Sequence, residues 1–236
     1  VRAYINVKSL ADAEYVNNNY IIMCTKDGTI KKTKLEAYSR PRQNGVNAIV
    51  IREGDQLIEA KLTSGDSEVL LAAKEGKAIR FNEKAVRPIG RTGAGVKGIT
   101  IDGDDEVVGM ICVEKDRKED ILVVSEHGYG KRTPAADYIR GGEEPQHRGG
   151  SGMKNYNITD KTGPVAAVKV VYDTDDVLVV SDDGVIIRME AAGISELGRA
   201  TQGVRIMRLS EGARVISVAL TDRAESEDAP AGETET

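Results

Sequence analysis

The residues best suited to chemistry in this chain are cations that recur at fixed distances from glycines. A lysine or arginine stands four residues after each of four turn glycines, and twice a second base adjoins it. The pairs are Gly28 and Lys32, Gly76 and Arg80, Gly128 and Arg132, and Gly184 and Arg188; the adjoining bases are Lys31 and Lys131. Cations repeated in this way suit the binding of phosphate groups.

A second set of cations lies further along each repeat. An arginine precedes a glycine by four or five residues, and a polar or basic residue follows that glycine by two. The arginines are Arg40 with Arg42 beside it, Arg91, Arg148 and Arg199; the later residues are Asn47, Lys97, Lys154 and Arg205. These positions are also candidates for phosphate contact.

The loop "QHRGGSG" combines an arginine with three glycines. Its residues are Gln146, His147, Arg148, Gly149, Gly150, Ser151 and Gly152. Glycines without a Cβ would let backbone N–H groups approach phosphate oxygens closely. The alternative is that these glycines only form tight turns between strands. In either case Arg148 is the better candidate for a contact.

Hairpins must position these residues, because each turn glycine follows an apolar run and precedes a second short strand. The hairpins begin at Ile21, Val69, Ile121 and Val177, at spacings of 48, 52 and 56 residues. An apolar run, a turn with glycine and another run is a strong hairpin signal. We therefore expect four repeats, near residues 20–68, 69–120, 121–176 and 177–220.

Repetition of this period predicts a radial or stacked β architecture. The opening "VRAYINV" matches "VRIMRL" from Val204, so the chain is expected to start partway through an earlier unit. The prediction is an all-β, propeller-like wheel of about five four-stranded blades over residues 1–220.

Charge divides the chain into two parts. The formal net charge is −5, but residues 221–236 hold six acids and one base, which leaves 32 acids and 32 bases in residues 1–220. The tail has almost no large apolar side chains and is expected to be disordered. One hypothesis is that it competes with nucleic acid for the cations of the neutral body.

Catalytic and metal-binding functions find little support. "GYGKRT" lacks the spacing of a P-loop, and His127 and His147 have no partners at zinc spacing. The "DGDDE" cluster at 102–106 lacks the rest of a calcium loop and is expected to be a solvated turn. Cys24 and Cys112 lie in apolar runs and are expected to be reduced core residues. No secretion signal or membrane-spanning run is evident.

The repeat, the run "HGYGKRT" at 127–133 and the box-like "QHRGGSG" at 146–152 together resemble the C-terminal domain of DNA gyrase A. That family forms a β-pinwheel that wraps DNA around a basic outer rim. The resemblance covers residues 1 to about 220. It implies a cytoplasmic, nucleoid-associated bacterial protein. It also implies a fragment with no active site or cofactor of its own, from an ATP-hydrolysing type II topoisomerase.

Two departures from the family pattern stand out. The family box reads QRRGGKG in the first repeat, whereas His147 and Ser151 replace two of its bases here, in the third full repeat. The first repeat itself is expected to be missing ahead of residue 1. The interval from turn glycine to box glycine is also longer, because "GGEEP" is inserted at 141–145.

The resemblance and the recurring cations together predict a monomeric DNA-wrapping module. Its partners would be duplex DNA, the rest of gyrase A, and gyrase B in the heterotetramer. The expected DNA-contact residues are Lys31, Lys32, Arg40, Arg42, Arg80, Arg91, Lys97, Lys131, Arg132, Arg148, Lys154, Arg188, Arg199 and Arg205. For the bases after the turn glycines, the alternative is pairing with acids of a neighbouring blade.

The alternative functions are the equivalent domain of topoisomerase IV and a protein-binding propeller. Tyr129 and Tyr138 are expected to be packing or rim residues.

Overall fold

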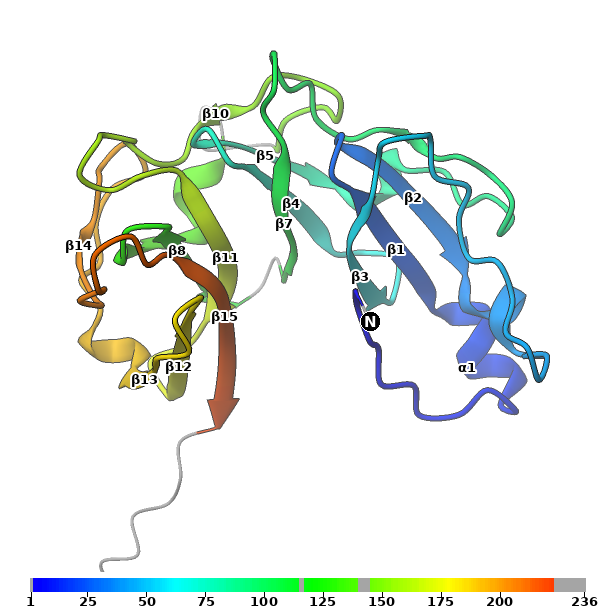
Figure 1. Cartoon of the computed structure of the whole chain (residues 1–236). Coiled ribbons are helices and arrows are strands. Elements are labelled where there is room, and N and C mark those ends of the chain that lie inside the picture. Colours follow the sequence, from blue (N-terminus) through cyan, green and yellow to red (C-terminus); the bar gives the residue numbers. More distant parts are fainter. Residues whose placement is uncertain (1, 115–116, 140–144, 223–236) are drawn as a thin grey trace, which may run out of the picture.

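Four antiparallel sheets follow one another along the chain and form an arc (Figure 1). The computed structural model describes residues 2–114, 117–139 and 145–222. The expected acidic tail therefore lies almost wholly outside the described residues, as does most of the "GGEEP" insertion. Each sheet is one blade, numbered 1 to 4 in chain order, so the expectation of an all-β, propeller-like fold is confirmed.

Each blade is built on one of the four expected hairpins, and a short 3-10 helix follows it. The hairpins are β1 (Tyr20–Thr25) with β2 (Thr29–Lys34), β4 (Glu68–Ala73) with β5 (Lys77–Asn82), β8 (Asp120–Ser125) with β9 (Tyr129–Pro134), and β12 (Asp175–Ser181) with β13 (Ile186–Glu190). The 3-10 helices are η1 (Leu35–Tyr38), η2 (Glu83–Ala85), η3 (Ala135–Tyr138) and η4 (Ala191–Gly193). The turn glycines have φ near +80°, a conformation that costs glycine little.

A third strand from the same repeat pairs with the first strand of each hairpin. These strands are β3 (Leu57–Thr63), β7 (Val107–Val113), β11 (Val165–Val171) and β15 (Val215–Asp222). Neighbouring third strands contact one another, β3 with β7, β7 with β11 and β11 with β15. They therefore form the inner side of the arc, and the second strands of the hairpins face outward (Figure 1).

The fourth strand of a blade comes from the next repeat, so a four-stranded blade does not coincide with one sequence repeat. These two-residue strands are β6 (Val96–Lys97), β10 (Met153–Lys154) and β14 (Val204–Arg205). They pair with β2, β5 and β9 of the preceding repeat. We call them the exchanged strands. Each one ties a blade to the repeat that follows it.

Blade 4 has three strands among the described residues, so β13 forms an open edge. Ile186, which corresponds to the paired Ile30, Ala78 and Gly130 of the other blades, is 62% exposed. The described residues form four blades rather than the expected five. Residues 2–12 contain no strand, and α1 (Ala13–Asn18) follows them, with Asp12 accepting a hydrogen bond from the Tyr15 N–H.

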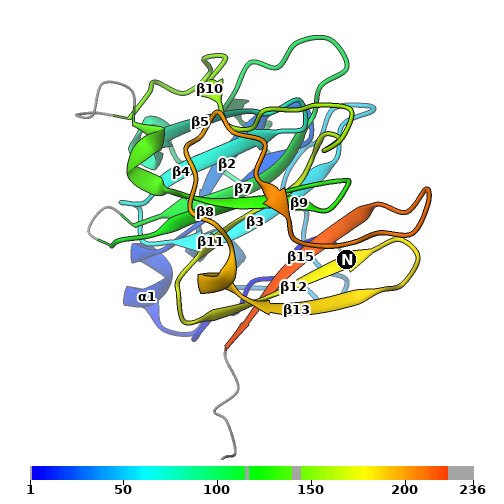
Figure 2. The same cartoon turned by 90° about the vertical axis from the view of Figure 1, so that its left-hand side faces the viewer.

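Apolar side chains fill the spaces between blades, because the hairpins of blades 1 to 3 are buried on both faces. Val69 and Leu71 of β4 pack toward blade 1, whereas Leu70 and Ala72 pack toward blade 3. Burying one such side chain contributes roughly 1.5–3 kcal/mol. Cys24 is a buried free thiol, as expected, and Cys112 is a half-buried one. Figure 2 views this stack from the blade 4 end of the arc.

Candidate nucleic-acid interface

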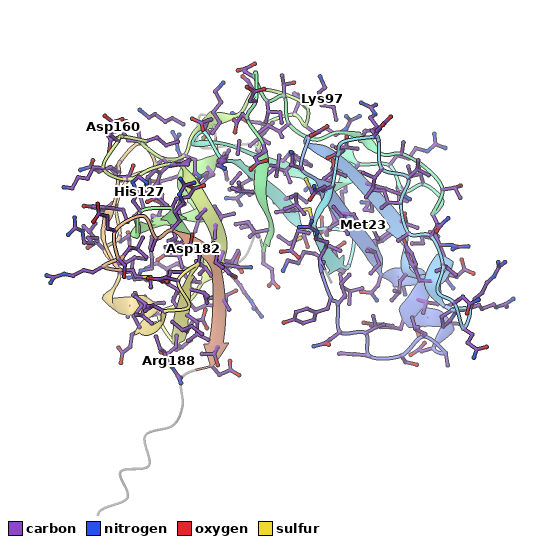
Figure 3. All side chains as sticks on the ribbon, viewed as in Figure 1. Met23, Lys97, His127, Asp160, Asp182 and Arg188 are labelled. Carbon is purple, nitrogen blue, oxygen red and sulfur yellow. The ribbon has the colours of Figure 1, made fainter. Side chains whose placement is uncertain are left out.

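The exchanged strands place one cation at the outer edge of each junction between blades. Lys97, Lys154 and Arg205 are the second residues of β6, β10 and β14, and their side chains are exposed. Figure 3 shows Lys97 at the outer side of the arc. The exposure agrees with their expected role, and the main-chain pairing beneath them fixes their positions.

Glycines allow the exchanged strands to lie close to the hairpin strands with which they pair. Gly152 has φ of +73°, and a Cβ there would lie 2.4 Å from the carbonyl oxygen of Ala78. Gly203 has φ of +75°, and its Cβ would lie 2.5 Å from the carbonyl oxygen of Gly130. Real Cβ atoms do not come this near to backbone atoms. These glycines are therefore required by strand exchange itself.

The loop arginines connect successive repeats. Arg148 donates from Nε to the carbonyl of Ala85 at 2.9 Å and from Nη1 to that of Lys97 at 3.1 Å. Arg199 donates in the same way to the carbonyls of Asp137 at 2.7 Å and Lys154 at 2.6 Å. Each guanidinium thus braces the cation-bearing dipeptide of the preceding repeat.

A continuous series of cations results along the outer edge of the arc, which we call the outer row. Its side chains are exposed or half-buried and come from all three junctions. The members are Arg91, Lys97, Arg148, Lys154, Arg199 and Arg205. Arg91 begins the row and donates to the carbonyl of Asn47 at 3.2 Å.

The glycine-rich loop at 146–152 acts mainly as a brace between repeats. The N–H of Gln146 donates to the carbonyl of Arg80 at 2.9 Å, and that of Gly149 to the carbonyl of Gly98 at 2.6 Å. The carbonyl of Gly150 accepts from the N–H of Thr100 at 2.8 Å. These backbone groups are already bonded within the protein, which favours turn geometry over phosphate approach. His147 and Ser151 are exposed.

The bases four residues after the turn glycines are buried in blades 1 to 3, which corrects the expectation of DNA contact there. Lys32, Arg80 and Arg132 are each less than a tenth exposed. Arg80 bonds the Glu68 carboxylate, with 2.6 Å between Nε and Oε2, and also donates to the carbonyl of Ala135 in blade 3. A charge can be buried only with such partners.

The other two bases are held in the same manner, so each one joins two blades. Lys32 donates to the carbonyl of Glu83 at 2.9 Å and lies 3.4 Å from the carboxylate of that residue. Arg132 donates to the carbonyl of Ile194 in blade 4 at 2.9 Å and pairs with Asp120 at 3.1 Å. The alternative of pairing with an acid of a neighbouring blade therefore holds for Lys32, whereas Arg80 and Arg132 pair with acids of their own blades and reach the next blade through carbonyl groups.

The adjoining bases Lys31 and Lys131 are also buried, which removes them from the candidate surface. Lys131 Nζ donates to the carbonyls of Gly198, at 2.8 Å, and Arg199 and lies 5.6 Å from the centre of the Tyr156 ring. Burial lowers the pKa of Lys131 to about 7, and Arg199 adds to the effect. Burial likewise lowers the pKa of Lys31 to about 8.

Arg188 differs from its counterparts because no further blade covers it among the described residues. Its side chain is 45% exposed and its Nε lies 2.6 Å from Oδ2 of Asp176. Figure 3 places it at the lower end of blade 4, away from the outer row. Arg40 and Arg42 are exposed in the connection between η1 and β3. Arg188 is therefore not part of the row, and Arg40 and Arg42 precede its first member, Arg91, in the chain.

Sequence reasoning missed a group of cations between blades 3 and 4. Lys161, Arg208 and Arg214 surround a pocket that also borders Arg205. Aligning the repeats on their exchanged strands gives a signal, because Arg208 occupies the place held by Thr100 and Asn157 in the two earlier repeats. This pocket extends the cationic surface at the blade 4 end of the outer row.

The remaining candidate groups for chemistry are structural. Tyr138 is buried and its hydroxyl donates to Oδ1 of Asn155 at 2.5 Å, so it is a packing residue. Tyr129 is 4% exposed. Within the described ranges, no cluster of three or more His, Cys, Asp or Glu side chains could hold a metal ion. No helix in those ranges is long and apolar enough to span a membrane.

Comparison with known proteins supports this reading of the fold. The family model described as DNA gyrase C-terminal domain, beta-propeller, matches residues 19–64, 67–114, 119–171 and 175–222. DNA gyrase A of Staphylococcus aureus (strain NCTC 8325 / PS 47) is 42% identical over 219 residues, covering 93% of this chain and 24% of that protein. DNA gyrase A of Staphylococcus epidermidis (strain ATCC 12228 / FDA PCI 1200) is 40% identical over 219 residues, with the same two shares.

Solved structures give the same result. A DNA gyrase A C-terminal domain superposes with a TM-score of 0.79 at 26% identity, covering 92% of this chain and 69% of that one. A C-terminal domain of DNA topoisomerase IV superposes with a TM-score of 0.81 at 24% identity, covering 92% and 64%. At that identity the second match shows the fold alone.

Four blades joined by exchanged strands define a β-propeller of the pinwheel kind. The chain belongs to the family of DNA gyrase A C-terminal domains, as its resemblance to that family predicted. It spans 24%, about a quarter, of the length of the curated relatives that it matches.

Proposed function

We propose that this domain binds duplex DNA along the outer row and bends it around the arc, as the DNA-wrapping domain of DNA gyrase A. The observation that carries the proposal is the outer row itself, in which six cations follow the outer edge across successive blades. Main-chain pairing and arginine braces hold these cations at corresponding positions. A curved series of fixed charges favours a bent duplex over a straight one.

Phosphate neutralisation would supply the affinity. Each contact releases condensed counterions, so binding is largely independent of sequence and falls steeply with salt. Residues 1–220 are neutral overall, but the outer row can still bind phosphate because nearby acids do not neutralise its cations. Lys97 has no carboxylate within 4.0 Å among the described residues, and Lys154 Nζ bonds the amide oxygen of Asn157 at 2.7 Å.

In the complete enzyme the wrapped duplex would be presented to the cleavage gate as the segment to be passed, in support of ATP-dependent negative supercoiling. This fragment would take no catalytic part, and the rest of gyrase A, together with gyrase B, would supply the chemistry. The equivalent role in topoisomerase IV is the alternative. Sequence identity of 42% to a DNA gyrase A favours gyrase.

A protein partner is a second candidate function, because blade 4 exposes apolar side chains. Ile186 on β13 is 62% exposed, and Ile216 and Leu220 on β15 are 60% and 37% exposed. Binding at such a face would depend little on salt, whereas phosphate binding depends strongly on it. Salt dependence therefore separates the two functions.

The test is equilibrium binding of residues 1–236 to a duplex of about 150 base pairs, roughly one persistence length, across a salt series. The Lys97→Ala/Lys154→Ala double variant should lower the steepness of the log–log salt slope by about 1.8, since each lost contact removes about 0.9. The matched control is Lys8→Ala/Lys118→Ala, which removes two exposed lysines outside the row. A flat slope for the unchanged chain, or equal losses in the two double variants, would overturn the proposal.

A further inference from the structure

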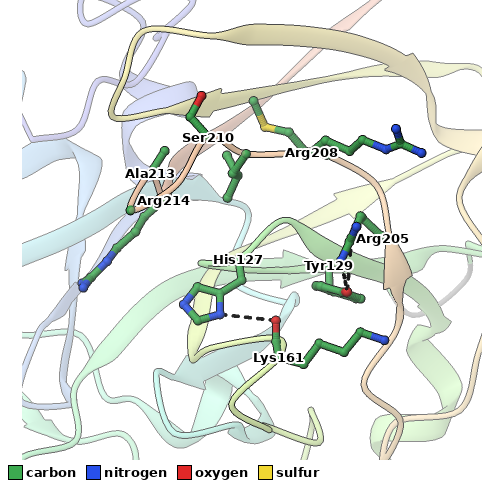
Figure 4. Close-up of a pocket in the computed structure, with 11 residues that line it drawn as sticks. His127, Tyr129, Lys161, Arg205, Arg208, Ser210, Ala213 and Arg214 are labelled. Carbon is green, nitrogen blue, oxygen red and sulfur yellow. Dashed lines mark hydrogen bonds between the residues drawn. The ribbon is translucent and has the colours of Figure 1, made fainter.

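A cationic pocket of about 500 Å³ lies between the turn of the β8–β9 hairpin and the loop that follows β14. His127, Tyr129, Lys161, Arg205, Arg208 and Arg214 contribute to its lining. In Figure 4 the side chains of Lys161 and Arg208 extend to the side on which Arg205 lies, the Arg205 side chain points toward Tyr129, and Arg214 extends to the other side. We call this space the junction pocket. It opens beside Arg205, the last cation of the outer row.

Tyr129 fixes the cations at the centre of the pocket. Its buried hydroxyl accepts from Nη2 of Arg205 at 2.8 Å and from Nε at 3.2 Å. Lys161 Nζ lies 5.3 Å from the centre of the same ring, as does the Arg205 guanidinium carbon. An aromatic ring attracts cations over its face, so Tyr129 holds two positive groups close together.

A tight turn supports Lys161 from behind. The carbonyl of Lys161 lies 3.3 Å from Nδ1 of His127, and the imidazole packs directly against Gly163. The N–H groups of Thr162 and Gly163 both donate to the carbonyl of Thr159 at 3.0 Å. The wall of the junction pocket is therefore preorganised by contacts within the protein.

Much of the positive charge in the pocket is not neutralised. Within the described ranges, neither Lys161 nor Arg208 has a carboxylate within 4.0 Å. Of the lining cations, only Arg214 approaches a carboxylate of the described part of the chain, with 3.6 Å between its Nη1 and Oε2 of Glu126. Asp160 and Glu211 are neighbours of lining residues in the sequence but do not line the pocket.

The corresponding corners of blades 1 and 2 carry acids instead. Oδ1 of Asp55 accepts from the N–H of Asp27 at 3.0 Å, and Oδ1 of Asp105 accepts from that of Glu75 at 3.0 Å. In blade 3 the corresponding N–H of His127 donates instead to the carbonyl of Thr162 at 3.0 Å, and the preceding residue, Lys161, adds a cation that lines the pocket. The change from carboxylate to cation distinguishes this junction from the other two.

We propose that the junction pocket binds a phosphate group. The proposal rests on the proposed function in one respect, because Arg205 belongs to both the pocket and the outer row. Tyr129 engages the Nε–Nη2 edge of the Arg205 guanidinium, so the Nη1–Nη2 edge is the planar fork that matches phosphate oxygens, and Lys161 and Arg208 add charge on the same side. The phosphate is either a backbone phosphate of the duplex or part of a free polyphosphate.

The chain contains two histidines, which provide a local probe. His127 lines the junction pocket, and His147 lies outside it in the loop at 146–152. Proton NMR of the imidazole C–H signals of residues 1–236 would be followed during titration with tripolyphosphate and, separately, with a short duplex. Tripolyphosphate should shift the signals of His127 and leave those of His147 nearly unchanged.

Lys161→Met/Arg208→Gln removes two exposed cations and leaves the buried Tyr129 and the exchanged strand in place. It should abolish the shift of His127 with tripolyphosphate. If the pocket takes a DNA phosphate, it should also lower the steepness of the DNA salt slope by about 1.8, whereas a free phosphate ligand leaves that slope unchanged. The matched control Lys8→Met/Arg40→Gln changes two exposed cations outside the pocket and should keep the shift.

The outcomes separate the two possible phosphate sources and the two proposals. A shift of His127 with the duplex assigns the pocket to the DNA backbone, and a shift with tripolyphosphate alone assigns it to a free phosphate ligand. If neither probe shifts His127 while DNA still binds with a steep salt slope, the pocket proposal is wrong and the proposed function stands. If tripolyphosphate shifts His127 but DNA does not bind, the proposed function fails alone.

Discussion

The guanidinium of Arg148 donates a hydrogen bond to the carbonyl of Lys97 at 3.1 Å, although the two residues belong to successive repeats. Arg199 and Lys154 have the same relationship one junction later, at 2.6 Å. Each pair brings two cations together through a main-chain oxygen, which neither charge would favour by itself. Because this arrangement recurs at successive junctions, the cations of separate repeats form one continuous cationic edge.

Arg148→Ala should lower both DNA affinity and stability, because Arg148 is a cation and a brace. The salt slope should become less steep by about 0.9. Loss of hydrogen bonds from a charged donor should also lower the free energy of unfolding by about 1.5–3 kcal/mol. Lys97→Ala is the matched control, because it removes one cation but no brace. It should reduce the salt slope by the same amount as Arg148→Ala and change the free energy of unfolding by less than about 0.5 kcal/mol. Urea denaturation measures stability, and equal stabilities of the two variants would contradict the bracing role of Arg148.

Arg80→Met should lower the free energy of unfolding by about 3–5 kcal/mol, because it removes one member of a buried ion pair with Glu68 and a hydrogen bond to the carbonyl of Ala135. Arg188→Met changes the corresponding residue of blade 4, whose side chain is 45% exposed, and should cost at most about 1 kcal/mol. Guanidinium denaturation of both variants checks the difference. Similar losses would mean that coverage by the next blade does not matter.

Gly152→Ala should destabilise the protein more than Gly212→Ala does. Both glycines have positive φ, so both substitutions introduce backbone strain of roughly 1–2 kcal/mol. A Cβ at 152 would also lie 2.4 Å from the carbonyl oxygen of Ala78, whereas nothing lies within 4 Å of one at 212. Thermal unfolding gives the comparison. Equal decreases in Tm would show that β10 can move away without cost.

Lys131 should make stability increase with pH above neutrality. Its pKa is about 7 in the folded protein and near 10.5 as a free side chain, so the unfolded chain binds more protons between these values. The resulting penalty is fully present below pH 7 and is relieved as the pH rises toward 10.5. The free energy of unfolding of Lys131→Met should therefore rise less between pH 7 and 9.5 than that of the unchanged chain. Lys97→Met, an exposed lysine, serves as the control and should keep the unchanged slope.

The hairpins could be predicted from the sequence, because the turn glycines and apolar runs are local signals. Strand exchange could not, since the pairing of Val204–Arg205 with β9 depends on tertiary packing rather than on any local pattern. A two-residue strand is too short to show the alternation of apolar and polar residues that is typical of a β-strand. The sequence likewise shows the cations of the outer row but not which blade they join.

The burial of the recurring bases differs from their predicted role in DNA contact, and the sequence does carry a signal for that burial. Glu68, Asp120 and Asp176 each stand twelve residues before an arginine, and each pairs with that arginine across its hairpin. An acid at a constant offset indicates a structural pair rather than a free cation. Tyr20 takes this place in the first repeat, where Lys32 lies 5.0 Å from the centre of its ring.

The most direct test of wrapping is the linking number of closed circular DNA. A relaxed plasmid would be incubated with residues 1–236, treated with a nicking–closing topoisomerase and freed of protein before electrophoresis. We expect topoisomers displaced in one direction. The displacement should be reduced by Lys97→Ala/Lys154→Ala and retained by Lys8→Ala/Lys118→Ala. DNA binding without any displacement would contradict wrapping around the arc.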